Sequence, residues 1–124
     1  MSIENLEWTD WKFFPNPSIF KKSLPSILRT LVKNPDNPGL YQLKNIKTQE
    51  FVLFGIGLNI AKRMGSLLPA KNGGVGTRNN HNKREYIWNN IENIQFRTIS
   101  TSTREEAKII EDYIKKLNIH LFNT

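Results

Sequence analysis

The chain has 124 residues, of which 38% are hydrophobic, and a formal net charge of +7 from 18 Lys+Arg against 11 Asp+Glu. This length favours one domain, and the absence of cysteine excludes a disulfide framework, a thiol nucleophile and a cysteine-ligated metal. No apolar run approaches the roughly 20 residues that span a bilayer, and the first residues are acidic where a signal peptide is basic. We therefore expect an intracellular, cytoplasmic protein without a membrane partner. Its positive charge favours a polyanionic binding partner.

The excess positive charge is concentrated in residues 51–84. This stretch holds six basic residues and no acidic one, which accounts for +6 of the total of +7. The six are Lys62, Arg63, Lys71, Arg78, Lys83 and Arg84. Such clustering is typical either of a solvated face with charges gathered by chance, or of one surface that neutralises phosphates.

Residues 1–38 are predicted to form an N-terminal arm that packs on the core. Ser23 as a helix N-cap and Pro25 in the first turn predict a short helix, which the turn-rich segment 34–39 ends. The arm also carries a cluster of aromatic residues, which core packing explains better than stacking on nucleic-acid bases: Trp8, Trp11, Phe13 and Phe14.

The middle of the chain predicts a hairpin followed by a helix. Residues 40–45 alternate weakly and residues 51–54 form a short apolar run, which indicates two antiparallel strands. Gly55 is expected to break the second strand. Asn59 is placed to cap a helix, and a glycine-rich basic loop is predicted over residues 69–82.

The last third of the chain predicts a helix, a strand and a helix. A helix is expected over residues 82–91 and a third strand over residues 94–100. Thr103 and Glu106 form a capping-box pattern that opens the last helix. The order of elements predicts an α+β fold, in which a small three-stranded antiparallel sheet is flanked by helices.

Several short motifs then occur in a fixed order and spacing: Gly39-Leu40-Tyr41, Leu53-Phe54-Gly55, Asn59, Arg63, Glu111 and Asn123. Their order resembles the GIY-YIG nuclease superfamily, over residues 39–123. The resemblance implies that residues 39–124 are a nuclease domain, a divalent-metal-dependent endonuclease that hydrolyses phosphodiester bonds in DNA.

The resemblance also implies a role for individual residues. Tyr41 corresponds to the tyrosine that positions or deprotonates the attacking water, and Arg63 to the arginine that faces the phosphate. Glu111 corresponds to the single ligand of Mg²⁺ or Mn²⁺, and Asn123 to the C-terminal asparagine that shapes the site. These residue types suit the reaction, since a phenol can accept a proton, a guanidinium binds phosphate and a carboxylate-held metal stabilises charge.

Each of these residues also has a plainer interpretation. Tyr41 fits a half-buried strand tyrosine, and Arg63 fits a solvated helix charge. Glu111 is spaced to pair with Lys115 at i+4, and Asn123 fits a frayed chain end.

The sequence departs from the family pattern at two positions. Leu53 stands where the second motif has its tyrosine, and Leu67 stands where many members have His or Tyr. His81 and Tyr86 are the available substitutes for proton transfer. His81 is a candidate catalytic base, because imidazole is the side chain most often used for proton transfer near neutral pH, although a surface-loop histidine is the plainer interpretation.

The leading hypothesis is an endonuclease that binds DNA through its basic surface. The candidate nucleic-acid-binding residues are Lys62, Arg78, Lys83, Arg84 and Asn123. The residues do not distinguish DNA from RNA and give no oligomeric state. The alternatives are a catalytically degenerate nucleic-acid-binding module of the same fold, and a protein-interaction domain that uses the aromatic arm.

Overall fold

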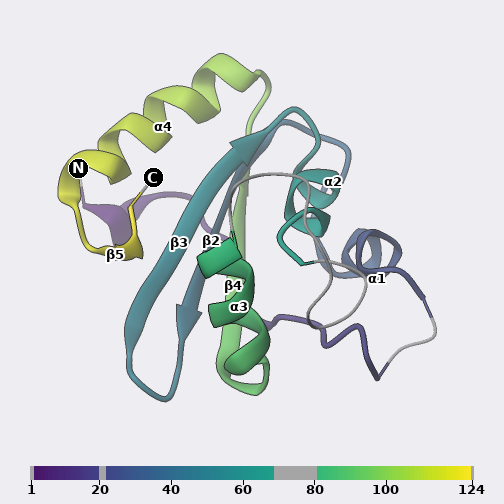
Figure 1. Cartoon of the computed structure of the whole chain (residues 1–124). Helices are drawn as coiled ribbons and strands as arrows, with labels where there is room; N and C mark the ends of the chain where they lie inside the picture. Colours follow the sequence, from purple (N-terminus) through teal and green to yellow (C-terminus); the bar gives the residue numbers. More distant parts are fainter. Residues whose placement is uncertain (1, 20–21, 69–80, 124) are drawn as a thin grey trace.

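The computed structural model describes residues 2–19, 22–68 and 81–123, which place helices on both faces of one sheet (Figure 1). The strands are β1 (Lys12–Phe13), β2 (Gly39–Asn45), β3 (Glu50–Gly57), β4 (Ile94–Ser100) and β5 (His120–Phe122). The helices are α1 (Leu24–Leu31), α2 (Ile60–Gly65), α3 (His81–Asn89) and α4 (Arg104–Leu117), with short 3-10 helices η1 (Ile3–Asn5) and η2 (Ile91–Asn93). The predicted α+β class is confirmed. Within the described ranges, every helix is too short or too polar to cross a membrane.

The sheet has five strands in the order β1-β4-β2-β3-β5. Its three central strands, β4, β2 and β3, are antiparallel, as the sequence predicts. The expected three-stranded sheet is nevertheless too small, because β1 pairs with β4 at one edge and β5 pairs in parallel with β3 at the other. These edge strands have only two and three residues, which is too short for an alternating pattern to appear in the sequence.

Strand β3 continues beyond its expected end. Gly55 pairs with Tyr41 and Gly57 pairs with Gly39, so the strand runs through both glycines. The expected break at Gly55 is wrong. Gly55 is paired with Tyr41 in the hydrogen-bonded ladder, and the ring of Tyr41 fills the space that a side chain at position 55 would take. The ladder therefore holds a residue that is otherwise unfavourable in a strand.

The two faces of the sheet carry separate groups of buried residues. Helices α1, α2 and α3 cover one face, and α4 covers the other (Figure 1). Buried residues on the first face include Leu28, Leu43, Ile60, Met64, Ile87 and Phe96. Those on the second face include Leu40, Phe54, Ile99, Ala107 and Ile114. Strand β5 pairs with β3 only at Phe51 and Leu53. Beyond Leu53, β3 is therefore the edge of the described sheet, and side chains from helices on opposite faces can meet beside it.

The predicted helix starts are confirmed by their caps. The side chains of Ser23, Asn59 and Thr103 accept hydrogen bonds from backbone N–H groups three residues later. Each cap pairs one backbone donor that has no partner inside the helix. Helix α2 ends at Gly65, and the buried Leu67 and Leu68 follow it in the irregular segment.

The N-terminal residues 2–19 and 22–38 share the core of the chain. Strand β1 extends the sheet, and Phe14, Leu24 and Leu28 lie among the buried side chains under α1 and α2. Trp8 and Trp11 both pack against Arg97, whose guanidinium carbon is 4.4 Å from each ring centroid. These tryptophans are therefore engaged within the fold.

Arg97 belongs to a buried polar network on the α4 face of the sheet. Its side chain donates to Glu4 Oε1 at 3.0 Å and to Gln42 Oε1 at 2.7 Å, while Gln42 Nε2 lies 2.9 Å from His120 Nε2. His120 packs against the ring of Phe54, with 4.6 Å between centroids. The network therefore joins the N-terminal segment, two central strands and β5.

Candidate functional site

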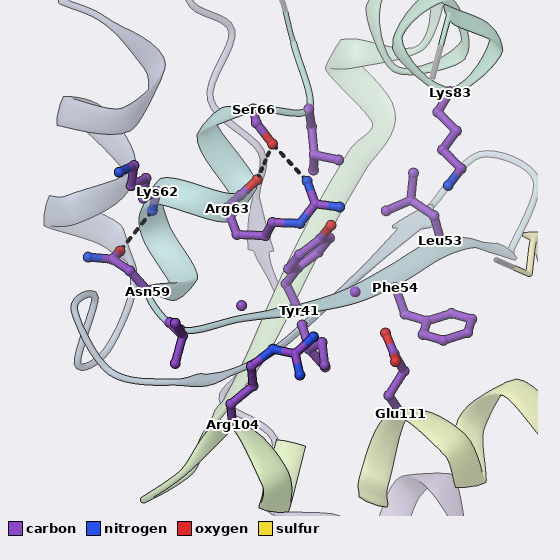
Figure 2. A pocket seen from close by; sticks show the side chains of 15 residues that line it. Tyr41, Leu53, Phe54, Asn59, Lys62, Arg63, Ser66, Lys83, Arg104 and Glu111 are labelled. Atoms are coloured by element: carbon purple, nitrogen blue, oxygen red, sulfur yellow. Dashed lines mark hydrogen bonds between the residues drawn. The ribbon is translucent and has the colours of Figure 1, made fainter. Parts of the chain in front are cut away.

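A pocket of about 680 Å³ lies beside β3, where residues from both faces of the sheet meet. Its polar side chains come from β2, α2, α3 and α4, which are far apart in the sequence (Figure 2). The phenol and the charged side chains that line it are those of Tyr41, Lys62, Arg63, Lys83, Arg104 and Glu111. The three residues expected to perform the chemistry, Tyr41, Arg63 and Glu111, are thus brought together around one cavity.

Tyr41 reaches the pocket across Gly55. It lies on β2 and is only 2% exposed. A Cβ atom at position 55 would lie 2.4 Å from the phenol oxygen of Tyr41, a distance that steric repulsion forbids. The absence of a side chain on β3 therefore lets the phenol pass over the neighbouring strand toward the cavity.

Arg63 is positioned by the end of α2. Asn59 caps this helix, and the Cβ of Arg63 would lie 2.8 Å from a Cβ placed at Gly57, so the helix approaches β3 closely. Arg63 Nη1 donates to Ser66 Oγ at 2.9 Å, and Ser66 Oγ donates back to the carbonyl of Arg63 at 2.7 Å. This pair of hydrogen bonds orients the guanidinium toward the pocket while leaving its other N–H groups for an anion (Figure 2).

Glu111 enters the pocket from α4. Its side chain is 19% exposed, and Oε1 accepts a hydrogen bond from Lys108 at 3.1 Å. The plainer interpretation, an ion pair with Lys115, is not found: among the described residues, Glu111 pairs with Lys108, on the preceding turn of the helix.

Among the described residues that line the pocket, Glu111 is also the one carboxylate. Across the described ranges, no group of three or more His, Cys, Asp and Glu side chains is placed to hold a metal ion. A single carboxylate suits Mg²⁺, which keeps several waters and takes further oxygen ligands from substrate phosphates. The donor set therefore fits a metal that is bound jointly by protein and substrate.

The pocket is strongly cationic. Lys62, Arg63, Lys83 and Arg104 line it against the single negative charge of Glu111. Burial and the nearby positive charge of Arg63 hold the pKa of Lys83 below its ordinary value. Such a concentration of positive charge favours a polyanionic ligand.

The other predicted residues lie elsewhere. The His81 side chain is 86% exposed, pairs with Glu85 at 3.1 Å and does not line the pocket, so its placement fits the surface interpretation. Tyr86 accepts a hydrogen bond from Asn45 Nδ2 at 3.0 Å, also away from the pocket. Arg84 is only 6% exposed, which leaves little of its side chain for a phosphate. Arg78 and most of the predicted loop 69–82 lie outside the described residues.

Asn123 contacts the end of α4. Its Nδ2 donates to the carbonyl of Lys115 at 2.9 Å, and the residue does not line the pocket. The same carbonyl, in the last turn of α4, also accepts the backbone N–H of the C-cap residue Asn118, at 3.3 Å. In this structure Asn123 therefore fastens the chain end to α4, and it is neither frayed nor turned toward the cavity.

The two departures from the family pattern form an apolar wall. Leu53 and Leu67 are both buried and both line the pocket. The Lys83 amine extends toward Leu53 from α3 (Figure 2). This part of the pocket wall is therefore hydrocarbon, with an amine beside it.

Sequence reasoning missed Arg104 and Ser66. Arg104 lies seven residues before Glu111, a spacing that places two residues on the same face of a helix. That spacing was a usable signal. Ser66 gave none, because its contact with Arg63 depends on the way the chain leaves α2.

Comparisons with known proteins add nothing to this geometry: no family model, curated protein or solved structure matches the chain.

Proposed function

We propose that this chain is a divalent-metal-dependent endonuclease of the GIY-YIG type that cuts phosphodiester bonds in DNA. The observation that carries the proposal is the convergence of Tyr41, Arg63 and Glu111 on one cationic pocket from three separate elements. A structural role alone does not require a phenol, a guanidinium and a carboxylate to line the same cavity. Phosphodiester hydrolysis can use all three: a base for the water, a cation for the phosphate and a carboxylate for a metal.

Arg63 binds the scissile phosphate in this proposal. Ser66 holds one N–H of its guanidinium, and the remaining donors are free to contact two phosphate oxygens. Because negative charge increases on these oxygens as water attacks, the guanidinium stabilises the transition state more than the bound substrate.

Tyr41 orients the attacking water. Its phenol is fixed by the narrow passage over Gly55, so the water that it binds is held in one position. To act as the base, Tyr41 takes part as the phenolate: it accepts the proton of the attacking water as the new P–O bond forms, the P–O bond to the leaving oxygen breaks, and the leaving oxygen takes up a proton from bulk water.

Glu111 would hold Mg²⁺ or Mn²⁺, which would supply positive charge to the phosphoryl oxygens. The contact with Lys108 restrains one carboxylate oxygen of Glu111 and leaves the other available to the ion.

A specific observation favours a second candidate function, a module that binds nucleic acid without cutting it. Leu53 and Leu67 replace two groups that take part in proton transfer in the family that this chain resembles, and both are buried in the pocket wall. The same cationic pocket would then bind phosphates and perform no hydrolysis.

Plasmid nicking with Mg²⁺ or Mn²⁺ tests the proposal. Wild type is expected to relax supercoiled DNA, and Glu111→Ala to lose at least about 100-fold in rate, since it removes the protein's metal ligand. Asp112→Ala is the matched control, because Asp112 is the neighbouring carboxylate and also pairs with Lys108, at 3.1 Å. It is expected to retain activity.

The same preparations distinguish the two candidates. Equal inactivity of wild type and Glu111→Ala on supercoiled DNA, linear duplex, single-stranded DNA and RNA contradicts the endonuclease. Affinity that falls steeply with salt, needs no metal and is unchanged by Glu111→Ala supports the binding module.

A further inference from the structure

Arg104 contributes a cation to the pocket that the proposed chemistry does not use. It is the first residue of α4, is exposed, and lines the cavity on the side opposite α2. Figure 2 shows its guanidinium extending from α4 toward the region of Tyr41. It therefore faces the same ligand as Arg63, from the other side of the pocket.

The surroundings of Arg104 do not explain it as a stabilising residue. A positive charge in the first turn of a helix opposes the helix dipole. Two other arginines are paired with carboxylates, Arg29 with Asp36 and Arg97 with Glu4. In the part of the chain that the structure describes, no hydrogen bond or ion pair joins the Arg104 side chain to another residue, although Glu105 and Glu106 follow it directly. Its charge is therefore available to a ligand.

The position of Arg104 along α4 separates it from the reacting phosphate. Arg104 and Glu111 share one face of the helix, but their seven-residue spacing places their Cα atoms about 10 Å apart along its axis. The side chains of Arg104 and Glu111 thus start two turns apart on this face of the helix, which leaves room for two neighbouring phosphates along the pocket.

We propose that Arg104 forms a second phosphate subsite, which binds the phosphate adjacent to the scissile one on the same strand. The assignment depends on the nucleic-acid binding in the proposed function, and it names the substrate class more narrowly. The pocket recognises at least two consecutive phosphates of an oligonucleotide strand, and a mononucleotide or a single phosphodiester fills only part of it.

Short oligothymidylates with free hydroxyl ends test the subsite without catalysis. The dinucleotide has one phosphate and the trinucleotide has two, and binding is followed by NMR titration at fixed low salt with a chelator present. Wild type is expected to bind the trinucleotide about tenfold more tightly than the dinucleotide, since a second charge-assisted contact is added. In Arg104→Ala the ratio falls to about twofold, which reflects only the number of phosphates offered.

Two variants control for effects of charge and of the helix. Lys116→Ala removes an exposed cation from the same helix outside the pocket, and it is expected to keep the wild-type ratio. Arg104→Lys keeps the charge and is expected to keep most of the ratio. An unchanged ratio in Arg104→Ala overturns the subsite in either of two forms. If both ligands bind as tightly as they bind to wild type, Arg104 contacts no phosphate; if both are weakened equally, Arg104 contacts the same phosphate as Arg63.

The outcome is separable from that of the proposed function. A ratio that depends on Arg104, together with failure of plasmid nicking, supports the subsite in a binding module and removes the nuclease. Nicking that depends on Glu111, together with an unchanged ratio in Arg104→Ala, supports the nuclease and removes the subsite. Absence of binding of both oligonucleotides to wild type contradicts the subsite and the nucleic-acid interpretation alike.

Discussion

The phenol of Tyr41 lies over Gly55 on the neighbouring strand, so closely that a Cβ atom at position 55 would be 2.4 Å from its oxygen and 2.6 Å from its Cζ. The two residues are paired in the β2–β3 ladder. Gly55 therefore leaves the space through which the phenol of Tyr41 reaches the pocket. The need for glycine at position 55 is steric and does not depend on an unusual backbone conformation.

Gly55→Ala is expected to move the phenol and to destabilise the fold by about 1–3 kcal/mol, the usual cost of excess volume in a packed core. Urea unfolding measures the stability, and plasmid nicking measures the activity. In a Tyr41→Leu background the same substitution is expected to cost less, because the shorter side chain leaves space for the new methyl group. Equal costs in the two backgrounds contradict the proposed contact.

The amine of Lys83 reports on the electrostatics of the pocket. Its pKa is held below the ordinary lysine value by burial and by the charge of Arg63. Arg63→Gln is therefore expected to raise the pKa of Lys83, whereas Arg63→Lys, which keeps the charge, is expected to change it less. NMR titration of the lysine ε-methylene signals measures both. A pKa of Lys83 that does not respond to Arg63→Gln contradicts the placement of these two groups around one cavity.

His120 couples stability to pH through the buried network. Burial, and secondarily the charge of Arg97, lower the pKa of His120 from 6.5 to about 4. The unfolded chain therefore binds a proton on this residue at a pH where the folded chain does not. Between pH 6.5 and about 4, stability is expected to fall as the pH falls, with a contribution from His120 of at most about 3 kcal/mol.

Urea unfolding of wild type and His120→Phe at several pH values isolates this contribution. The difference between the two proteins is expected to change across the range from pH 6.5 to about 4 and to stay constant above pH 7.5. The ring of Phe preserves the packing against Phe54 and removes the titrating group. A constant difference throughout contradicts a neutral, buried His120.

Much of the fold was predictable because its local signals are strong. Thr103 and Asn59 are good N-caps, and both start helices where the sequence places them. The strand expected over residues 94–100 has those bounds in the structure. Strands β1 and β5 escaped prediction because their pairing is determined by neighbouring strands and not by their own two or three residues.

The site was predictable as a set of residues but not in its full composition. Tyr41, Arg63 and Glu111 carry recognisable spacing and line one pocket. His81 and Asn123 do not line the pocket. His81 lies at the exposed start of α3 and pairs with Glu85, and Asn123 is hydrogen-bonded to the end of α4. Lys83 lines the pocket and the adjacent Arg84 is buried, since neighbouring helical residues point about 100° apart. Charge counting along the sequence cannot separate such a pair.

A substitution at Leu53 tests most directly whether a second phenol would make the pocket a faster nuclease. Leu53 lines the pocket from β3, at the position where the family that the chain resembles has its second tyrosine. Leu53→Tyr is expected to raise the nicking rate about tenfold or more, because it adds a group that can orient or deprotonate water. The larger ring is expected to cost about 1–3 kcal/mol of stability in this buried wall.

Leu53→Phe is the matched control for the tyrosine variant. It adds the same ring without the hydroxyl, so it is expected to carry a similar loss of stability with no gain in rate. Circular dichroism and urea unfolding establish that the two variants are folded to the same extent. A tyrosine variant that is no faster than the phenylalanine variant means that proton transfer in this pocket does not depend on a phenol at position 53. In that case the amine of Lys83, which extends toward the same wall, becomes the group whose substitution should alter the pH dependence of cleavage.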